Sequence, residues 1–451
     1  MTEARKEEQK KNSSDYIVST VGIFFFKVAG QPFTILSSLF VAGFLGPTEK
    51  GLAAITQLIP VFLSGMFDLG IGAALKYQVS RGDGRFKDIG VTSVILGFLQ
   101  GSVIGLIYLV LSTMDFLGDY SEGIPFWIKI SSAILIPLMI VRQILFMGFA
   151  GDDDFKTSNV LNFVASVLFA LLSVFAVTVM DAGFEGVYMS FLIATLGTVF
   201  ITLGRYWVKY TPQCKVDIGF IKFSYDYGLR AWIGAVVRRG NVSLDQLLLG
   251  MLAPASALGN YSVSVSLAKL LYLIPVSISP VLTNVVAKAK GEMSASKVAL
   301  VQRVLTLLTF VLAIVISIGA WIVCPIVLPE FDQLPNLILV LLLGAVFYSA
   351  FHVLSSYFVG GGQPEKPGLC QIPALLASLA CYPLLIPELG AMGAAIGSVV
   401  SYLLMYIAIA WMFAKDSKTP IVALWSYSKK DLKWIYETLL VFINRFKKKN
   451  S

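Results

Sequence analysis

The sequence predicts an all-α integral membrane protein of twelve transmembrane helices, arranged as two parallel six-helix lobes related by a pseudo-two-fold axis around a central cavity. Composition, apolar runs and an internal repeat lead to this prediction. The 451 residues are 57% hydrophobic and 14% charged, whereas a soluble globular chain carries about 25% charged residues. So few charges cannot cover a soluble surface of this size, and we expect the chain to lie in a membrane.

Apolar runs of about 20 residues are long enough to cross a bilayer as a helix. Several runs here exceed the hydrocarbon thickness, so we expect tilted or kinked helices, with Pro32 and Pro60 as candidate kink sites. The twelve runs lie roughly at residues 17–44, 52–79, 89–112, 125–148, 158–180, 186–208, 228–251, 255–286, 298–328, 334–359, 367–386 and 391–414.

The placement of lysine and arginine predicts the orientation. With the N-terminus in the cytoplasm, the inside segments carry 26 of these cations and the outside loops carry one, Lys50. Such an asymmetry places both termini on the cytoplasmic side of the inner (cytoplasmic) membrane, with an even number of spans. The first sixteen residues are too charged for a cleavable signal peptide.

Two stretches of the chain recur about 207 residues later. FLGPTEKGLAAITQ at 44–57 resembles MLAPASALGNYSVSVS at 251–266, and GFEG at 183–186 returns as GAMG at 390–393. Six spans are an even number, so both repeats have the same orientation, and we expect the cavity between them. The predicted organisation is a cytoplasmic tail at 1–16, an N-lobe at 17–208, a cytoplasmic linker at 209–227, a C-lobe at 228–414 and a cytoplasmic amphipathic tail at 415–451.

The final tail contains KDLKWIYETLLVFINRF at 430–446, which places apolar side chains on one helical face and precedes three lysines. A segment of this kind is predicted to lie on an anionic membrane surface. Docking of a polysaccharide-assembly protein is the alternative.

The stretch YGLRAWIGAVVRRGNVSLDQLLLGMLAP at 227–254 carries charges within apolar sequence. Arg238, Asn241 and Asp245 share one helical face, with Arg239 beside it. Charged side chains within a membrane normally face a water-filled cavity or a partner, so we expect this face to form a cavity wall. Alternatively, Arg238 or Arg239 pairs with Asp245 or another acid and only holds helices together.

Subtracting the repeat offset from this polar face gives Lys27, Gln31, Thr34 and Ser38 in the first span, so polar faces of both lobes are predicted to meet. Cations outnumber acids within the spans by three, an excess that attracts anions, and the arginine fork suits phosphate oxygens. The predicted substrate-binding residues are Lys27, Gln31, Arg142, Arg238, Arg239, Asn241 and Lys269.

The two acids within the spans, Asp68 and Asp245, have two interpretations. They couple transport to a proton or sodium gradient, or they are fixed partners of the cavity cations. The four cysteines lack zinc spacing, so neither a metal site nor another cofactor is predicted. The single histidine, His352, is expected to be a packed residue.

A resemblance to a known family extends over residues 14–414. It rests on the two repeated segments, on the DQLLLGMLAPASALGNYS run at 245–262, and on the GFEG and GAMG turns. The chain resembles the polysaccharide transporter family, the O-antigen type oligosaccharide flippases of the multidrug, oligosaccharidyl-lipid and polysaccharide exporter superfamily. The resemblance implies a flippase, not an enzyme, that moves polyprenyl-diphosphate-linked oligosaccharide repeat units from the inner to the outer leaflet by alternating access, for cell-surface polysaccharide biosynthesis. Its partners would be this lipid-linked glycan and membrane lipid.

Other functions remain open. A cation-coupled multidrug exporter of the same superfamily has the same two-lobe plan, but the predicted positive cavity and the DQLLLG run argue against it. A lipid II type flippase would be expected to have two further C-terminal spans. A glycan polymerase or ligase would need a large outside loop, and the longest predicted one is at 113–124. The net charge of +8 arises from lysines and arginines that lie mostly in the predicted cytoplasmic segments, so it does not indicate nucleic-acid binding.

Overall fold

The computed structural model describes residues 3–82, 85–114, 123–288 and 292–426, with side chains from Gly30 onward apart from a few positions. Within these ranges the chain is helical and contains no strand. The helices are α1 (Glu3–Met66), α2 (Ile71–Ser80), α3 (Arg85–Thr113), α4 (Phe126–Gly151), α5 (Phe155–Thr178), α6 (Gly183–Tyr210), α7 (Ile218–Leu252), α8 (Ala255–Lys288), α9 (Glu292–Val327), α10 (Leu334–Gly360), α11 (Glu365–Leu389), α12 (Ala391–Ser417) and the short 3₁₀ helix η2 (Ile421–Leu424).

Nine helices in the described ranges are long and apolar enough to cross a membrane, and the bent pair of α1 and α2 adds a tenth. The chain is therefore a multi-pass membrane protein. Helix α7 is not among the nine although it has 35 residues. Its apolar sequence is interrupted by Arg238, Arg239 and Asp245, which lowers its hydropathy below that of an ordinary span.

Helix α1 contains both the first and most of the second predicted span. Its non-helical residue is Gly46, with φ 68° and ψ 175°, a backbone conformation that favours glycine. Across this turn the Lys50 Nζ donates a hydrogen bond to the Ser38 Oγ at 3.0 Å, so the second leg (47–66) folds back along the first. Pro32 and Pro60, the predicted kink sites, lie inside the helical legs.

A second break separates α1 from α2. Leu69 and Gly70 have positive φ, and the two helices meet at 53°. The Asp68 Oδ1 accepts a hydrogen bond from the Gly70 N–H at 3.1 Å, and the Trp232 indole of α7 donates to the Met66 carbonyl. Polar groups of Asp68 and Trp232 therefore stabilise a bend that the sequence predicted as continuous helix.

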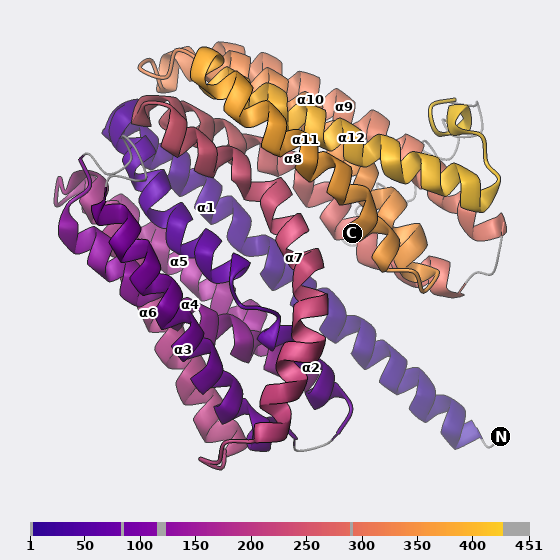
Figure 1. The fold of residues 1–451 in the computed structure, drawn as a ribbon. Helices are drawn as coiled ribbons and strands as arrows, with labels where there is room; N and C mark the ends of the chain where they lie inside the picture. Colours follow the sequence, from indigo (N-terminus) through magenta and orange to yellow (C-terminus); the bar gives the residue numbers. More distant parts are fainter. Residues whose placement is uncertain (1–2, 83–84, 115–122, 289–291, 427–451) are drawn as a thin grey trace, which may run out of the picture.

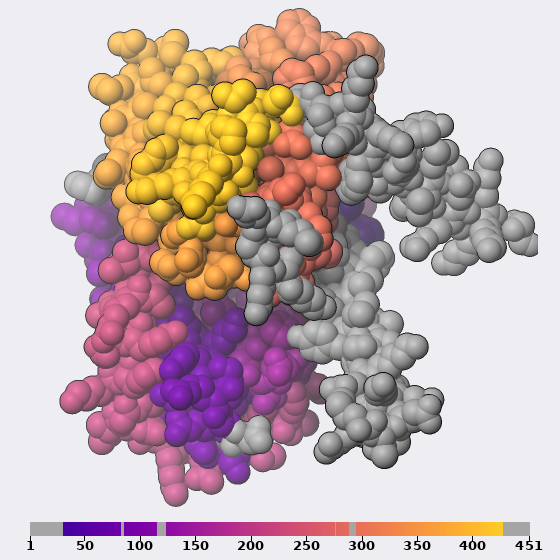
Figure 2. Space-filling view, turned by 90° about the vertical axis from the view of Figure 1, so that its right-hand side faces the viewer, coloured from indigo at the N-terminus to yellow at the C-terminus, as the bar shows by residue number. Residues whose placement is uncertain are grey.

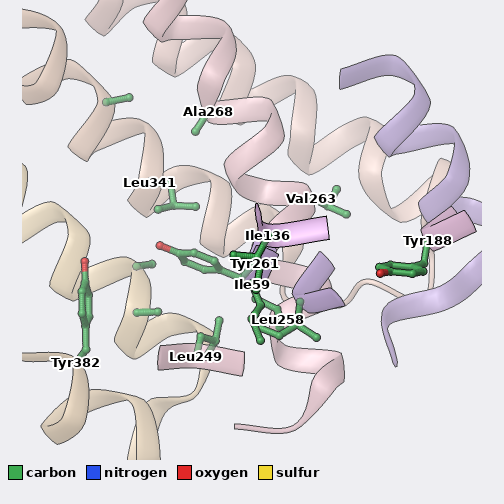
Figure 3. Packing of buried hydrophobic residues seen from close by; sticks show 14 of the residues in the cluster. Ile59, Ile136, Tyr188, Leu249, Leu258, Tyr261, Val263, Ala268, Leu341 and Tyr382 are labelled. Atoms are coloured by element: carbon green, nitrogen blue, oxygen red, sulfur yellow. The ribbon is translucent and has the colours of Figure 1, made fainter. Parts of the chain in front are cut away.

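The ribbon divides into two groups of helices, α1 to α6 and α8 to α12, with α7 running from the first group to the second (Figure 1). The space-filling view shows the two groups as separate masses, and the surface recedes between them (Figure 2). They share one apolar core, in which Tyr261 packs among Ile59, Leu249 and Leu258 from three helices (Figure 3).

The two repeated segments contact each other directly where α1 meets α8. A Cβ on Gly51 would lie 1.8 Å from the carbonyl oxygen of Ala255, and a Cβ on Gly259 would lie 1.8 Å from the carbonyl oxygen of Pro47. Each segment thus packs a glycine against the backbone of the other segment. Small residues at such positions let helices approach closely. We call this contact the glycine seam.

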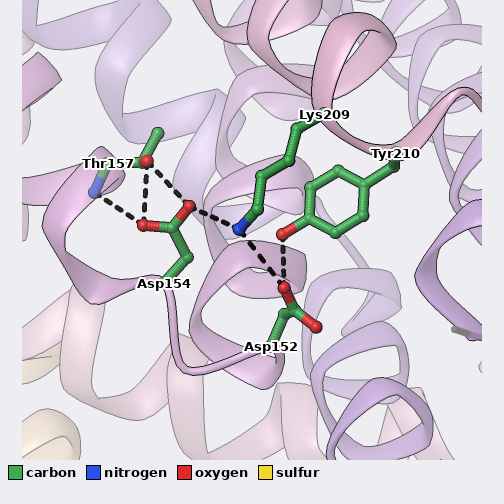
Figure 4. A network of polar contacts seen from close by, with 5 residues as sticks. All are labelled: Asp152, Asp154, Thr157, Lys209 and Tyr210. Atoms are coloured by element: carbon green, nitrogen blue, oxygen red, sulfur yellow. Dashed lines mark hydrogen bonds and ion pairs between the residues drawn. The ribbon is translucent and has the colours of Figure 1, made fainter. Parts of the chain in front are cut away.

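A polar cluster fastens the connection between α4 and α5 to the end of α6 (Figure 4). The Lys209 Nζ lies 2.8 Å from Asp154 Oδ2 and 3.4 Å from Asp152 Oδ2, and the Tyr210 hydroxyl donates to Asp152. Burial alone would raise the pKa of the Asp154 carboxyl, but hydrogen bonds from Lys209 and Thr157 outweigh it and hold that pKa below its ordinary value of 3.8.

A carboxyl whose pKa is lower in the folded state stabilises the fold above its unfolded pKa, and this contribution is lost as the pH falls through the folded pKa. We therefore expect Asp154→Asn to reduce the unfolding free energy by about 1 kcal/mol at pH 7, and to make a smaller difference at an acidic pH below 3.8, as the carboxyl becomes protonated. Melting curves in detergent at both pH values test this, with Asp153→Asn as the matched control. Equal melting at pH 7 would contradict a stabilising role for this ion pair.

Candidate functional site

A cavity lies among α1, α4, α5, α6, α7 and α8 and consists of two adjoining pockets. The first has a volume of about 280 Å³ and the second about 490 Å³. They share Thr34, Gln57, Phe169 and Phe191, so the two pockets adjoin each other. The first pocket is lined by residues of both groups of helices, whereas the second pocket lies within the group α1 to α6.

Three cations line this cavity. Lys50 and Lys269 line the first pocket and Arg142 lines the second, while the described lining of both contains no aspartate or glutamate. Lys269 lies midway along α8 and is nevertheless exposed, because it faces the open cavity. Cations in a lining that holds no carboxylate attract anions where the surrounding dielectric is low, although Lys269 also interacts electrostatically with the buried Asp245 of α7. The lining cations are thus the predicted Arg142 and Lys269, together with Lys50.

Lys50 is the site residue that the sequence analysis missed. We predicted it in an outside loop, but it lies in the second leg of α1, is 8% exposed, and bonds to Ser38 across the turn. The prediction was wrong because Gly46 and Pro47 end one helical leg and begin the next without a loop. Pro at the first position of a helix gave the available signal, since it places Lys50 in the first turn.

Arg142 lies on α4, where its side chain faces α6. Its Nη1 donates to the Thr198 Oγ1 at 3.2 Å, and its guanidinium carbon lies 5.4 Å from the Phe146 ring centre. Its Nε is buried and has no hydrogen-bond partner among the described residues. A guanidinium has five N–H donors, so this contact pattern leaves donors for an anionic ligand in the second pocket.

Asp245 belongs to a buried hydroxyl network on the opposite side of α7. Its Oδ2 accepts hydrogen bonds from the Tyr261 hydroxyl at 2.7 Å and from the Ser398 Oγ at 3.3 Å, and Ser398 also contacts the Tyr382 hydroxyl at 3.1 Å. Within the described structure no salt bridge joins Asp245 to an arginine. The pairing of Arg238 or Arg239 with Asp245 is therefore not observed, but Arg239 interacts electrostatically with another acid, Asp68.

Asn241, one helical turn before Asp245, is also turned away from the cavity. It is 3% exposed, donates to the Gln371 carbonyl at 2.9 Å and accepts from the Ser401 Oγ at 3.3 Å. Both partners lie more than 100 residues away in sequence. The polar stripe of α7 therefore begins at an exposed arginine and ends inside the second group of helices.

Arg238 is exposed, and Arg239 is half-buried against the second leg of α1. A Cβ on Gly65 would lie 1.8 Å from the Arg239 guanidinium, so a larger residue there would displace that guanidinium. Neither arginine lines the two pockets. Gln246, further along α7, does line the first pocket, so the arginines lie on the part of α7 that leads toward the cavity.

The other predicted site residues are placed as follows. Gln31, Arg142 and Lys269 line the cavity. The side chain of Lys27 and the amphipathic segment 430–446 lie outside the described part of the chain. His352 packs edge-on against Tyr348, and no group of three metal-binding side chains occurs in the described ranges.

Comparisons with known proteins identify the family. Residues 40–330 match a family model described as polysaccharide biosynthesis protein. A putative O-antigen transporter of Shigella flexneri is 22% identical over 83% of this chain and 92% of its own. The fold resembles the lipid II flippase MurJ in an inward closed conformation (TM-score 0.74, 13% identity, 95% of this chain and 99% of that one) and a multidrug resistance MATE family transporter in an inward-facing conformation (TM-score 0.67, 17% identity, 87% and 95%).

These proteins are transporters and flippases, which confirms the prediction that the chain is not an enzyme. The family match covers more than half of the sequence and includes the repeated segments at 44–57 and 251–266 and both lysines of the first pocket. The chain belongs to the polysaccharide biosynthesis protein family.

Proposed function

We propose that this protein is a flippase that moves polyprenyl-diphosphate-linked oligosaccharide from the inner to the outer leaflet. The observation that carries the proposal is the cavity with Lys50, Lys269 and Arg142 and no acid in its described lining. A diphosphate offers several anionic oxygens to these donors, and hydrogen bonds between charged groups are stronger than neutral ones. The family membership and the O-antigen transporter relative support the same substrate class.

The second pocket suits the glycan. Amide side chains line it beside phenylalanine rings, and sugars present hydroxyls to the former and C–H faces to the latter. Binding pockets commonly combine apolar walls with a few polar groups that fix orientation. The polar and aromatic lining comprises Gln31, Gln57, Asn159, Asn162, Phe163, Phe169 and Phe191.

Movement between leaflets is proposed to occur by alternating access of two six-helix lobes related by a pseudo-two-fold axis, with both termini cytoplasmic. The glycine seam would hold the outer ends of the lobes together while the cavity receives substrate from inside. Arg238 and Arg239 lie near the middle of α7, on the predicted cytoplasmic side of Gln246. We propose them as the first contacts of the diphosphate, with Lys27 as a further cation of the first span.

In this proposal, Asp245 couples transport to a proton or sodium gradient. A carboxylate surrounded by the hydroxyls of Tyr261, Ser398 and Tyr382 can take up a proton or bind sodium, and membrane carboxylates often do so. Asp68 bonds to the Gly70 N–H at the break after α1, which gives it a structural task as well. A pH or sodium dependence of transport that is unchanged in Asp245→Asn would contradict the coupling role.

A cation-coupled multidrug exporter is the second candidate, favoured by the structural similarity to a MATE family transporter. An organic cation would meet three positive charges in the observed cavity. Efflux of organic cations by the purified protein in liposomes, without movement of lipid-linked oligosaccharide, would favour this candidate.

The direct test measures translocation of a fluorescent polyprenyl-diphosphate oligosaccharide in liposomes. Arg238→Ala and Arg239→Ala are expected to lower the initial rate about tenfold, since a hydrogen bond between charged groups contributes about 1.5–3 kcal/mol. Arg230→Ala is the matched control, because this exposed α7 arginine already pairs with Asp226. Wild-type rates in both variants at equal folded amounts would make Arg238 and Arg239 structural residues.

A further inference from the structure

An apolar groove of about 290 Å³ lies outside the cavity described above, between the second leg of α1, α3 and α7. Its described lining is aliphatic and aromatic and includes no charged side chain. Each helix contributes to it, with Ile59 and Leu63 from α1, Ile104 and Ile107 from α3, and Leu247 and Met251 from α7.

The groove and the cationic first pocket lie on opposite sides of the same wall. On α7, Gln246 lines the pocket and the next residue, Leu247, lines the groove. On the second leg of α1, Leu58 lines the pocket and Ile59 lines the groove. The wall therefore consists of the second leg of α1, from the first half of the chain, and α7, from the second half. A relative movement of the two halves would open this wall.

The groove faces the surrounding membrane. Ile107 is 48% exposed although it lines the groove. The α3 and α7 residues that line the groove lie in the last third of each helix, on the same part of α7 as the first pocket. With the predicted orientation, this is the outer half of the membrane.

We propose that this groove binds the polyprenyl tail of the transported lipid while its diphosphate lies in the first pocket. The inference rests on the proposed function and adds the site of the tail. A ligand with an anionic head and an apolar chain needs a polar and an apolar site next to each other, and the wall of α1 and α7 separates two such sites. Burial of apolar chain in the groove would contribute about 25 cal/mol per Å². An ordinary phospholipid carries one phosphate group where the polyprenyl lipid carries two, so the pocket cations should favour the diphosphate.

The test uses the full-length protein in liposomes with two photoreactive lipids. One is a polyprenyl-diphosphate oligosaccharide with a diazirine in its tail, and the other is a phospholipid with the same group in an acyl chain. Ile107 lines the groove, and its neighbour Leu106 is 63% exposed and does not line it. The polyprenyl probe should label Ile107 and Leu247 at least about tenfold more than Leu106, whereas the phospholipid should label Leu106 and Ile107 alike.

Two variants give an independent readout. Ile107→Trp fills the groove and should raise the KM for the lipid-linked oligosaccharide about tenfold, while Leu106→Trp at the adjacent position should leave it unchanged. Transport by the wild type, with equal labelling of Leu106 and Ile107 and the same KM in both variants, overturns the tail site and leaves the flippase proposal standing. A wild-type protein that moves no lipid-linked oligosaccharide overturns the proposed function and this inference with it.

Discussion

Lys269→Gln is expected to lower kcat/KM for lipid-linked oligosaccharide about thirtyfold, the factor that corresponds to about 2 kcal/mol for a hydrogen bond between charged groups. Lys269 is exposed to the cavity midway along α8, and the described lining of its pocket holds no acid. Lys50→Gln should act in the same direction. Lys269→Arg keeps the positive charge and should retain transport within about threefold of wild type.

Initial transport rates in liposomes, measured over a range of substrate concentrations, give these values. Lys222→Gln is the control, because Lys222 is an exposed α7 lysine that does not line the cavity. If Lys269→Gln and Lys50→Gln together moved the oligosaccharide at the wild-type rate, neither lysine would bind the diphosphate. If the double variant instead gained efflux of organic cations, the multidrug exporter would become the better description, because removal of positive charge favours a cationic substrate.

Much of the fold could be predicted from the sequence because the membrane imposes strong rules. Apolar runs of spanning length indicate helices wherever they occur, and the repeat of the segment at 44–57 predicts that two similar regions lie in equivalent places. The structure brings these regions together through Gly51 and Gly259. The predicted spans at 17–44 and 52–79 leave a break that includes Gly46, but the sequence could not place the break at 67–70, since that one depends on one or two backbone conformations rather than on hydropathy.

The candidate site could be predicted only in part. Gln31, Arg142 and Lys269 line the cavity as expected. Helical periodicity also placed Arg238 and Asp245 on one face, but it does not determine what that face contacts. The partner of Asp245 that turns it away from the cavity, Ser398, lies 153 residues away in sequence. Such long-range contacts decide the direction of a side chain, and a single sequence does not contain them.

Gly51→Val is expected to open the outer end of the cavity. Its Cβ would lie 1.8 Å from the carbonyl oxygen of Ala255, and a backbone atom cannot rotate away as a side chain can. Overpacking of this kind costs about 1–3 kcal/mol, occasionally more. The cost falls on the conformation in which α1 and α8 touch, so the population should shift toward conformations in which the glycine seam is apart.

Labelling of a cysteine measures this shift. Ser262 is 8% exposed and lines the first pocket, so Ser262→Cys, in a chain whose four native cysteines are replaced by serine, reports entry to the cavity. A membrane-impermeant maleimide added outside should react with it at least about tenfold faster in Gly51→Val than in the parent. Gly197→Val is the matched control, because nothing lies within 4 Å of a Cβ at Gly197. Gly51→Ala introduces the same Cβ with less bulk and covers the case in which the valine variant does not fold. Equal labelling of the parent, Gly51→Ala and Gly197→Val would mean that the glycine seam does not close the outer end of the cavity, and the alternating-access proposal would then need its outer gate elsewhere.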